Sequence, residues 1–79
     1  MKPDVFFDEL NYEIHCMRLD PILVTMSDEP AENYTIHLMD GHRSRGIDWI
    51  ISKDAVDIIN KEWLKNLAKS IVKRFEEEI

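Results

Sequence analysis

Hydrophobic residues recur every three or four positions through the last third of the chain, a period that predicts an amphipathic α-helix. No glycine or proline interrupts this pattern, and Ser52 stands where an N-cap residue is expected. We therefore expect one long helix over about residues 53–76. Its apolar stripe consists of Val56, Ile59, Trp63, Leu67, Ile71 and Phe75, widened by Leu64, Ala68 and Val72.

The middle of the chain alternates apolar and polar residues, which predicts β-strands. Three runs show it, at about residues 21–26, 34–39 and 46–51. The last two runs are joined by a segment that begins with Asp40-Gly41, a dipeptide typical of hairpin turns. The pattern therefore predicts a three-stranded antiparallel meander.

The first twenty residues fit two patterns. Phe6 or Phe7, Leu10, Ile14 and Met17 would share one helical face, whereas Leu10, Tyr12, Ile14 and Cys16 alternate with polar residues as in a strand. We favour the helix, because Pro3 followed by Asp4 suits a helix start. Cys16 is expected to be buried, as cysteine usually is. The fold class is then α+β: a single α-β-β-β-α domain over residues 1–79, with the long C-terminal helix packed on the sheet.

Composition excludes several classes of protein. The chain has 79 residues, so one domain is expected, and its single cysteine cannot form an internal disulfide framework. No apolar stretch approaches the roughly 18–20 residues that span a bilayer, so no membrane partner is expected. The N-terminus lacks the basic and then apolar order of a signal peptide, which predicts a cytoplasmic location.

Charge is distributed unevenly along the chain. Residues 1–40 contain two basic and nine acidic residues, a formal charge of −7, whereas residues 41–79 contain eight basic and seven acidic residues, a charge of +1. An acidic surface attracts basic partners and repels nucleic acid. We therefore expect a protein partner with a basic surface, bound by Asp4, Asp8, Glu9, Glu13, Asp28, Glu29 and Glu32. The same carboxylates would also keep a small domain soluble.

Two basic groups could instead contact an anion or nucleic acid. One is the hairpin tip, with His42, Arg43 and Arg45; the other is the row Lys61, Lys65, Lys69 and Lys73, spaced four residues apart on the last helix. Such a row can follow a phosphate backbone. It is also typical of the solvated face of an amphipathic helix.

No catalytic constellation, cofactor site or metal site is predicted. Metal ligands would have to come from His15, Cys16, His37 and His42, which lack the paired spacing of structural zinc sites. A nucleophilic Cys16 would need a histidine and an acid facing it, and His15 points in another direction. With two glycines, the chain has no phosphate-binding glycine-rich loop. We therefore do not expect an enzyme.

These observations favour a small acidic protein–protein interaction domain that regulates or inhibits a larger protein. The adjacent Phe6 and Phe7 cannot both face one core from a helix, so one covers an edge or lies in an interface. A nucleic-acid-binding regulator is the first alternative. The second is a homo-oligomer, such as a homodimer, built on the long helix.

The element order α-β-β-β-α resembles that of double-stranded-RNA-binding domains, and Ser52-Lys53-Asp54-Ala55 is similar to part of their helix-entry motif. This chain has Asp54 where that family has a second basic residue, and its first helix is acidic, so we transfer no residue role. In size and acidity the chain also resembles small inhibitors encoded by phages or plasmids.

Overall fold

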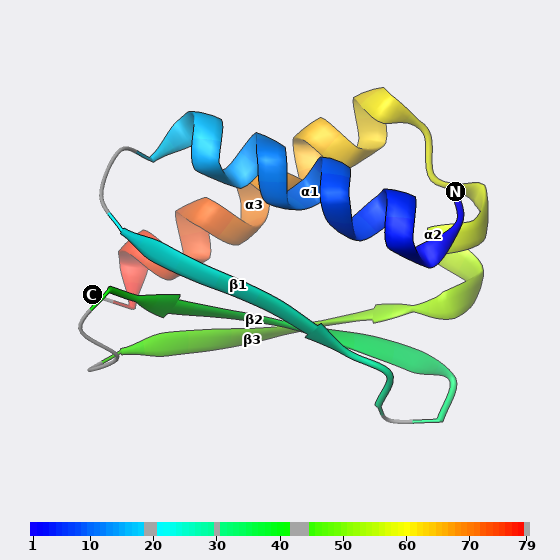
Figure 1. Ribbon diagram of the computed structural model, residues 1–79, viewed down its shortest axis with the longest axis horizontal. Coiled ribbons are helices and arrows are strands. Elements are labelled where there is room, and N and C mark those ends of the chain that lie inside the picture. Colours follow the sequence, from blue (N-terminus) through cyan, green and yellow to red (C-terminus); the bar gives the residue numbers. More distant parts are fainter. Residues whose placement is uncertain (19–20, 30, 42–44, 79) are drawn as a thin grey trace.

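The computed structural model describes residues 1–18, 21–29, 31–41 and 45–78. It contains helix α1 (Pro3–Met17), strands β1 (Ile22–Ser27), β2 (Asn33–Asp40) and β3 (Gly46–Ser52), and helices α2 (Lys53–Ile58) and α3 (Lys61–Glu77). The strands form one antiparallel sheet in the order β1-β2-β3. Helices α1 and α3 lie over one face of this sheet, as Figure 1 shows. The predicted α+β layout is confirmed, and the first segment is a helix.

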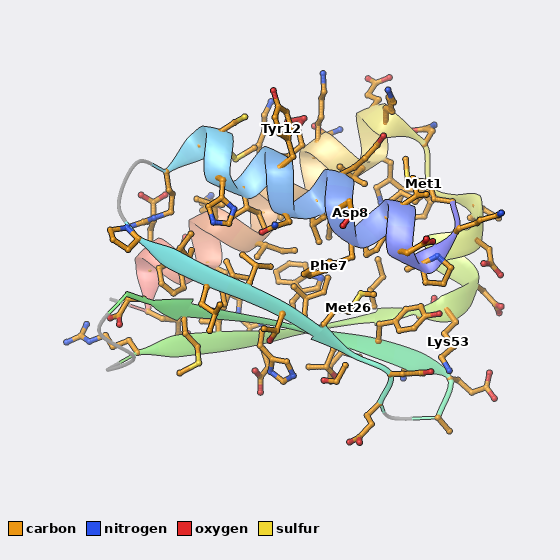
Figure 2. The ribbon with its side chains drawn as sticks, viewed as in Figure 1. Met1, Phe7, Asp8, Tyr12, Met26 and Lys53 are labelled. Carbon is orange, nitrogen blue, oxygen red and sulfur yellow. The ribbon has the colours of Figure 1, made fainter. Side chains whose placement is uncertain are left out.

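The hydrophobic core fills the space between the helices and the sheet. Alternation along the strands directs Ile36 and Leu38 inward, while α1 contributes Phe6, Leu10 and Ile14, at helical spacing. The remaining buried side chains are Ile22, Val24, Ile47, Ile51, Val56, Ile59, Leu64, Leu67, Ala68, Ile71, Val72 and Phe75. Phe7 is half-buried and packs against the core near Met26, so it covers an edge of the core (Figure 2).

The expectation of one continuous helix over residues 53–76 is wrong. The chain is extended at Ile59 and Asn60, which separates α2 from α3. The Asn60 side chain accepts a hydrogen bond from the Trp63 amide at 2.8 Å and so begins a second helix. The predicted cap at Ser52 is present, since its hydroxyl accepts from the Ala55 amide at 3.1 Å.

The break also changes which side chains of α3 reach the core. Leu64 is buried, whereas Trp63 is 41% exposed. The prediction that Trp63 belongs to the buried stripe is therefore wrong. The other members of the predicted stripe are buried against the chain's own core. The apolar face of α3 is therefore used within this chain.

Polar contacts fix the two ends of α1. The Met1 ammonium donates to the main-chain oxygens of Val56 at 3.0 Å and Asp57 at 2.8 Å, near the C-terminal end of α2. Cations are favoured there because the helix dipole is negative at that end. At the other end, Arg18 forms an ion pair with Glu76 at 3.5 Å and lies over the Phe75 ring.

Candidate docking groove and polar row

A groove lies between α1 and α3, on the side of the helices away from the sheet. It is a hollow of about 350 Å³. Its lining residues are Asp8, Glu9, Tyr12, Glu13, Lys61, Leu64 and Lys65. The three carboxylates come from α1 and the two lysines from α3, and the buried Leu64 supplies an apolar surface between them. We call this feature the helix groove.

The carboxylates of the helix groove differ in how they are neutralised. Glu9 forms an ion pair with Lys61 at 3.9 Å. No such pair joins Asp8 or Glu13 to any other residue in the described part of the chain. In the described part of the chain these two carboxylates therefore have no ion-pair partner, although Lys65 lines the same groove.

Tyr12 is the aromatic side chain among the residues that line the helix groove. It is 67% exposed and points away from the sheet, with Asp8 one helical turn before it (Figure 2). Only the strand alternative for the first segment grouped Tyr12 with Leu10 and Ile14, and the helix separates it from them. Cys16, one turn after Tyr12, is also exposed, because the buried face of α1 consists of Phe6, Leu10 and Ile14. The expected burial of Cys16 is thus wrong.

The surroundings of Tyr12 make its phenol harder to ionise. A hydrogen bond with Cys16, the negative charge of that thiolate and the Glu13 carboxylate raise the pKa of Tyr12 above its ordinary value of 10.0. We expect Cys16→Ala to move this pKa back toward 10.0, because the two largest causes are removed. The phenolate absorbance of a Tyr34→Phe background, titrated with alkali, measures it, since only two tyrosines are present.

Cys16→Ser serves as the control, because a hydroxyl keeps a hydrogen-bonding group but does not become an anion in this range. Its Tyr12 pKa should lie between those of the parent and of Cys16→Ala. An unchanged Tyr12 pKa in Cys16→Ala would contradict the assigned causes.

The predicted acidic residues fall into two separate groups. Asp4, Asp8, Glu9 and Glu13 lie on α1, whereas Asp28, Glu29 and Glu32 belong to the connection between β1 and β2, at one end of the sheet (Figure 1). Lys53, the first residue of α2, contacts this connection twice. Its ammonium forms an ion pair with Asp28 at 2.5 Å, and its main-chain amide donates to the Glu32 main-chain oxygen. The hydrogen bond to Asp28 raises the pKa of Lys53.

The predicted basic residues are not gathered into one surface either. His42 and Arg43 lie outside the described residues, and Arg45 is exposed beside β3. The four lysines of α3 are all exposed, but Lys61 and Lys65 line the helix groove together with three carboxylates. A polyanion following this row would meet those carboxylates.

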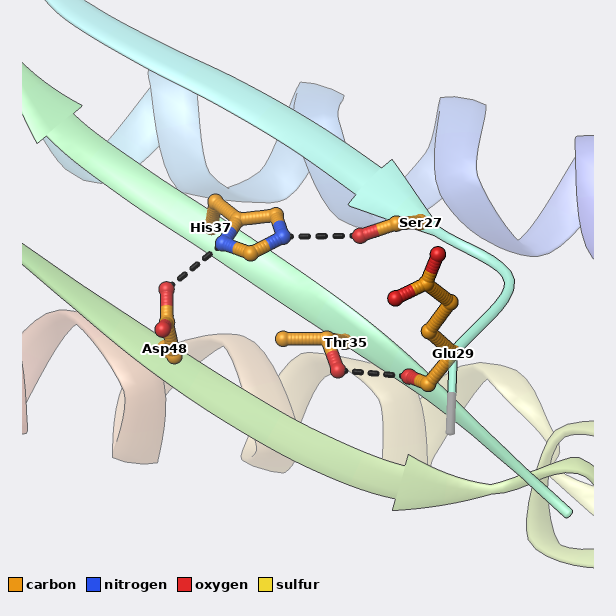
Figure 3. Close-up of polar contacts among 5 residues, drawn as sticks. All are labelled: Ser27, Glu29, Thr35, His37 and Asp48. Atoms are coloured by element: carbon orange, nitrogen blue, oxygen red, sulfur yellow. Dashed lines mark hydrogen bonds and ion pairs between the residues drawn. The ribbon is translucent and has the colours of Figure 1, made fainter. Parts of the chain in front are cut away.

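The second notable feature lies on the opposite, uncovered face of the sheet. The strand register places three rows of side chains there: Leu23–Met39–Gly46, Thr25–His37–Asp48 and Ser27–Thr35–Ile50. His37 is central, directly opposite Asp48 and diagonal to Ser27. Its Nδ1 is 2.6 Å from Asp48 Oδ1, and its Nε2 is 2.7 Å from Ser27 Oγ (Figure 3). We call Ser27, His37 and Asp48 the polar row.

The acceptor and donor roles in the polar row follow from the chemistry of its groups. A carboxylate only accepts, so His37 Nδ1–H donates to Asp48, and in the neutral imidazole Nε2 then accepts from the Ser27 hydroxyl. Sequence reasoning did not identify these three residues as a group. Counting outward from the Asp40-Gly41 turn would have paired His37 with Asp48, because the hairpin is closed by the Asp40 amide and the Arg45 carbonyl.

The described residues contain no group of three or more His, Cys, Asp or Glu side chains placed to hold a metal ion. In the same part of the chain, no helix has the length and apolar character needed to cross a bilayer. Comparisons of this chain with protein-family models, with curated proteins and with solved structures find no match.

Proposed function

We propose that this chain is a small docking module that binds a basic surface of a larger protein through the helix groove. The observation that carries the proposal is the combination of an exposed Tyr12 with the carboxylates of Asp8 and Glu13, which form no ion pair in the described part of the chain. Tyrosine is enriched among residues that dominate binding energy, because it buries a large area with few rotatable bonds. Carboxylates beside it select an arginine or lysine side chain.

Charge favours a basic protein over nucleic acid as the partner. The chain carries a formal charge of −6, and three acidic residues of α1 line the helix groove. Association with a basic surface is accelerated by this field, whereas a phosphate backbone is repelled. Regulation or inhibition of the bound protein, in a cytoplasmic setting, is the function that we assign to such docking.

A dye-labelled decapeptide of alternating arginine and alanine is a suitable probe, and fluorescence anisotropy measures its affinity. We expect the double variant Asp8→Lys/Glu13→Lys to weaken binding about tenfold or more, about 1.4 kcal/mol, because attraction becomes repulsion at the contact. Tyr12→Ala should weaken binding about as much without changing the net charge, since the aromatic contact area is lost.

The matched control is Glu29→Lys/Glu32→Lys, which makes the same change in net charge at the β1–β2 connection. It should weaken binding only about twofold to threefold, since exposed charges farther than about 10 Å apart are largely screened at 0.1 M salt. Equal losses in the two double variants would show that net charge alone attracts the peptide and would overturn the groove. Tighter binding of a single-stranded DNA oligonucleotide than of the peptide would favour the nucleic-acid alternative.

A further inference from the structure

The polar row joins its three side chains through the same atoms that a serine nucleophile uses in a Ser–His–Asp triad. In such triads the carboxylate holds Nδ1–H, and Nε2 takes the proton of the attacking hydroxyl. Here Asp48 Oδ1 is 2.6 Å from Nδ1, and Ser27 Oγ is 2.7 Å from Nε2. Both distances lie within the reach required for proton transfer.

From this geometry we propose that Ser27 is an activated nucleophile that accepts acyl groups from activated carboxylic esters. Ser27 Oγ attacks the carbonyl carbon, and its proton passes to His37 Nε2. The bond between the carbonyl carbon and the alcohol oxygen then breaks, and the leaving alcohol takes the bonding electron pair and a proton from the imidazolium. The product is an ester of Ser27, with no change in oxidation state.

Each residue of the polar row has a distinct role in this step. Ser27 forms the new bond, and His37 is the general base that receives its proton. Asp48 is a positioning residue, because it acts through His37 by fixing the ring and the tautomer that leaves Nε2 free to accept. General-base assistance of this kind contributes about 10²- to 10⁴-fold to a rate.

The location of the polar row limits the substrates. It lies on the sheet face that the helices leave uncovered, and the Asp48 side chain is 66% exposed (Figure 1, Figure 3). Water therefore surrounds the ester carbonyl oxygen, on which negative charge develops during the attack. It stabilises that charge less than the fixed hydrogen-bond donors of a preorganised cavity would. Esters with good leaving groups, such as aryl esters, are the class that such a nucleophile accepts. The neighbouring apolar side chains Leu23 and Ile50, 43% and 60% exposed, offer contact to an acyl chain.

Acylation of Ser27 does not depend on docking at the helix groove. The helix groove lies on the outer side of the helices, whereas the polar row lies on the opposite side of the molecule, beyond the sheet. Loss of acylation would leave the docking proposal intact, and loss of peptide binding would leave the polar row intact.

The test exposes the intact chain, in a Cys16→Ala background that removes the competing thiol, to p-nitrophenyl acetate. Release of p-nitrophenolate follows the reaction, and peptide mapping by mass spectrometry locates the acetyl group. Ser70 is an internal reference, because its hydroxyl donates to the Asn66 carbonyl, which cannot remove a proton in this way. We expect Ser27 to be acetylated about 100-fold faster than Ser70, and His37→Gln to remove that advantage.

Asp48→Asn should slow acetylation of Ser27, because a carboxamide does not hold His37 Nδ1–H and its tautomer as a carboxylate does, and Asp48→Glu, which restores a carboxylate, should recover part of the rate. Circular dichroism establishes that the variants fold as the parent does. Equal rates at Ser27 and Ser70, an acetyl group that stays on His37, or a rate unaffected by His37→Gln would each overturn the proposal.

Discussion

Replacing Phe6 with alanine is expected to lower the free energy of unfolding by about 3–5 kcal/mol. The Phe6 side chain is 0% exposed and is the first of the three α1 residues that face the core. Its removal combines lost burial with a cavity that close-packed neighbours fill only in part. A chain of 79 residues has a total stability of roughly 4–12 kcal/mol at about 0.05–0.15 kcal/mol per residue. The loss is therefore a large share of the total.

Phe7→Ala is the matched control, because it deletes the same side chain one position along the same helix. Phe7 is half-buried at the edge of the core, so its loss should cost about half as much or less. Urea denaturation followed by circular dichroism measures both. Phe6→Leu, expected to cost about 1–1.5 kcal/mol as a smaller apolar change, keeps the comparison measurable if Phe6→Ala does not fold. A Phe7→Ala variant as unstable as Phe6→Ala would contradict the assigned orientation of α1.

The second large effect is expected at Gly46, where β3 begins. A Cβ atom at this position would lie 2.7 Å from the Leu38 main-chain oxygen and 3.2 Å from Met39 Cγ. The main-chain oxygen belongs to the paired strand β2 and cannot move without disturbing the sheet. Gly46→Ala gains about 0.5–1 kcal/mol from the lower entropy of the unfolded chain. It loses about 1–3 kcal/mol to the steric conflict, so a net loss of stability is expected.

Ile50→Ala provides the comparison for Gly46→Ala, because Ile50 lies on the same strand and the same sheet face and is 60% exposed. Its cost should stay below about 1 kcal/mol, the span of strand propensity. Thermal and urea unfolding of both variants decide the point. A Gly46→Ala protein at least as stable as the parent would show that β2 yields to the added methyl group without cost.

Much of the fold follows from local patterns that the sequence carries. The alternation around Ile36 and Leu38, the Asp40-Gly41 turn and the Ser52 cap each act within a few residues, so the meander and its following helix were predictable. The preference for a helix within the first twenty residues was also confirmed, by α1. In each case the physical cause, a periodic apolar face or a capping hydrogen bond, is complete within one element.

The candidate sites were predictable only in part. The acidic residues of α1 were predicted to form a binding surface. Their position beside Lys61, Leu64 and Lys65 was not predicted, because α1 and α3 are far apart in the sequence. Tyr12 belongs to the apolar positions of the strand pattern in the first segment, but not to those of the helix pattern. Its exposure follows once the segment is a helix, because Tyr12 then lies on the side of α1 away from Leu10 and Ile14.

The sequence by itself determined the α+β layout, the antiparallel meander around the Asp40-Gly41 turn and the uneven charge. Only the tertiary structure decided that Trp63 and Cys16 lie outside the core, and that Ser27 reaches His37 on the neighbouring strand. The reason is physical. Periodicity and capping are settled between neighbours in the chain, whereas the rotation of a helix on the core and the pairing of distant strands are settled by the packing of the whole molecule.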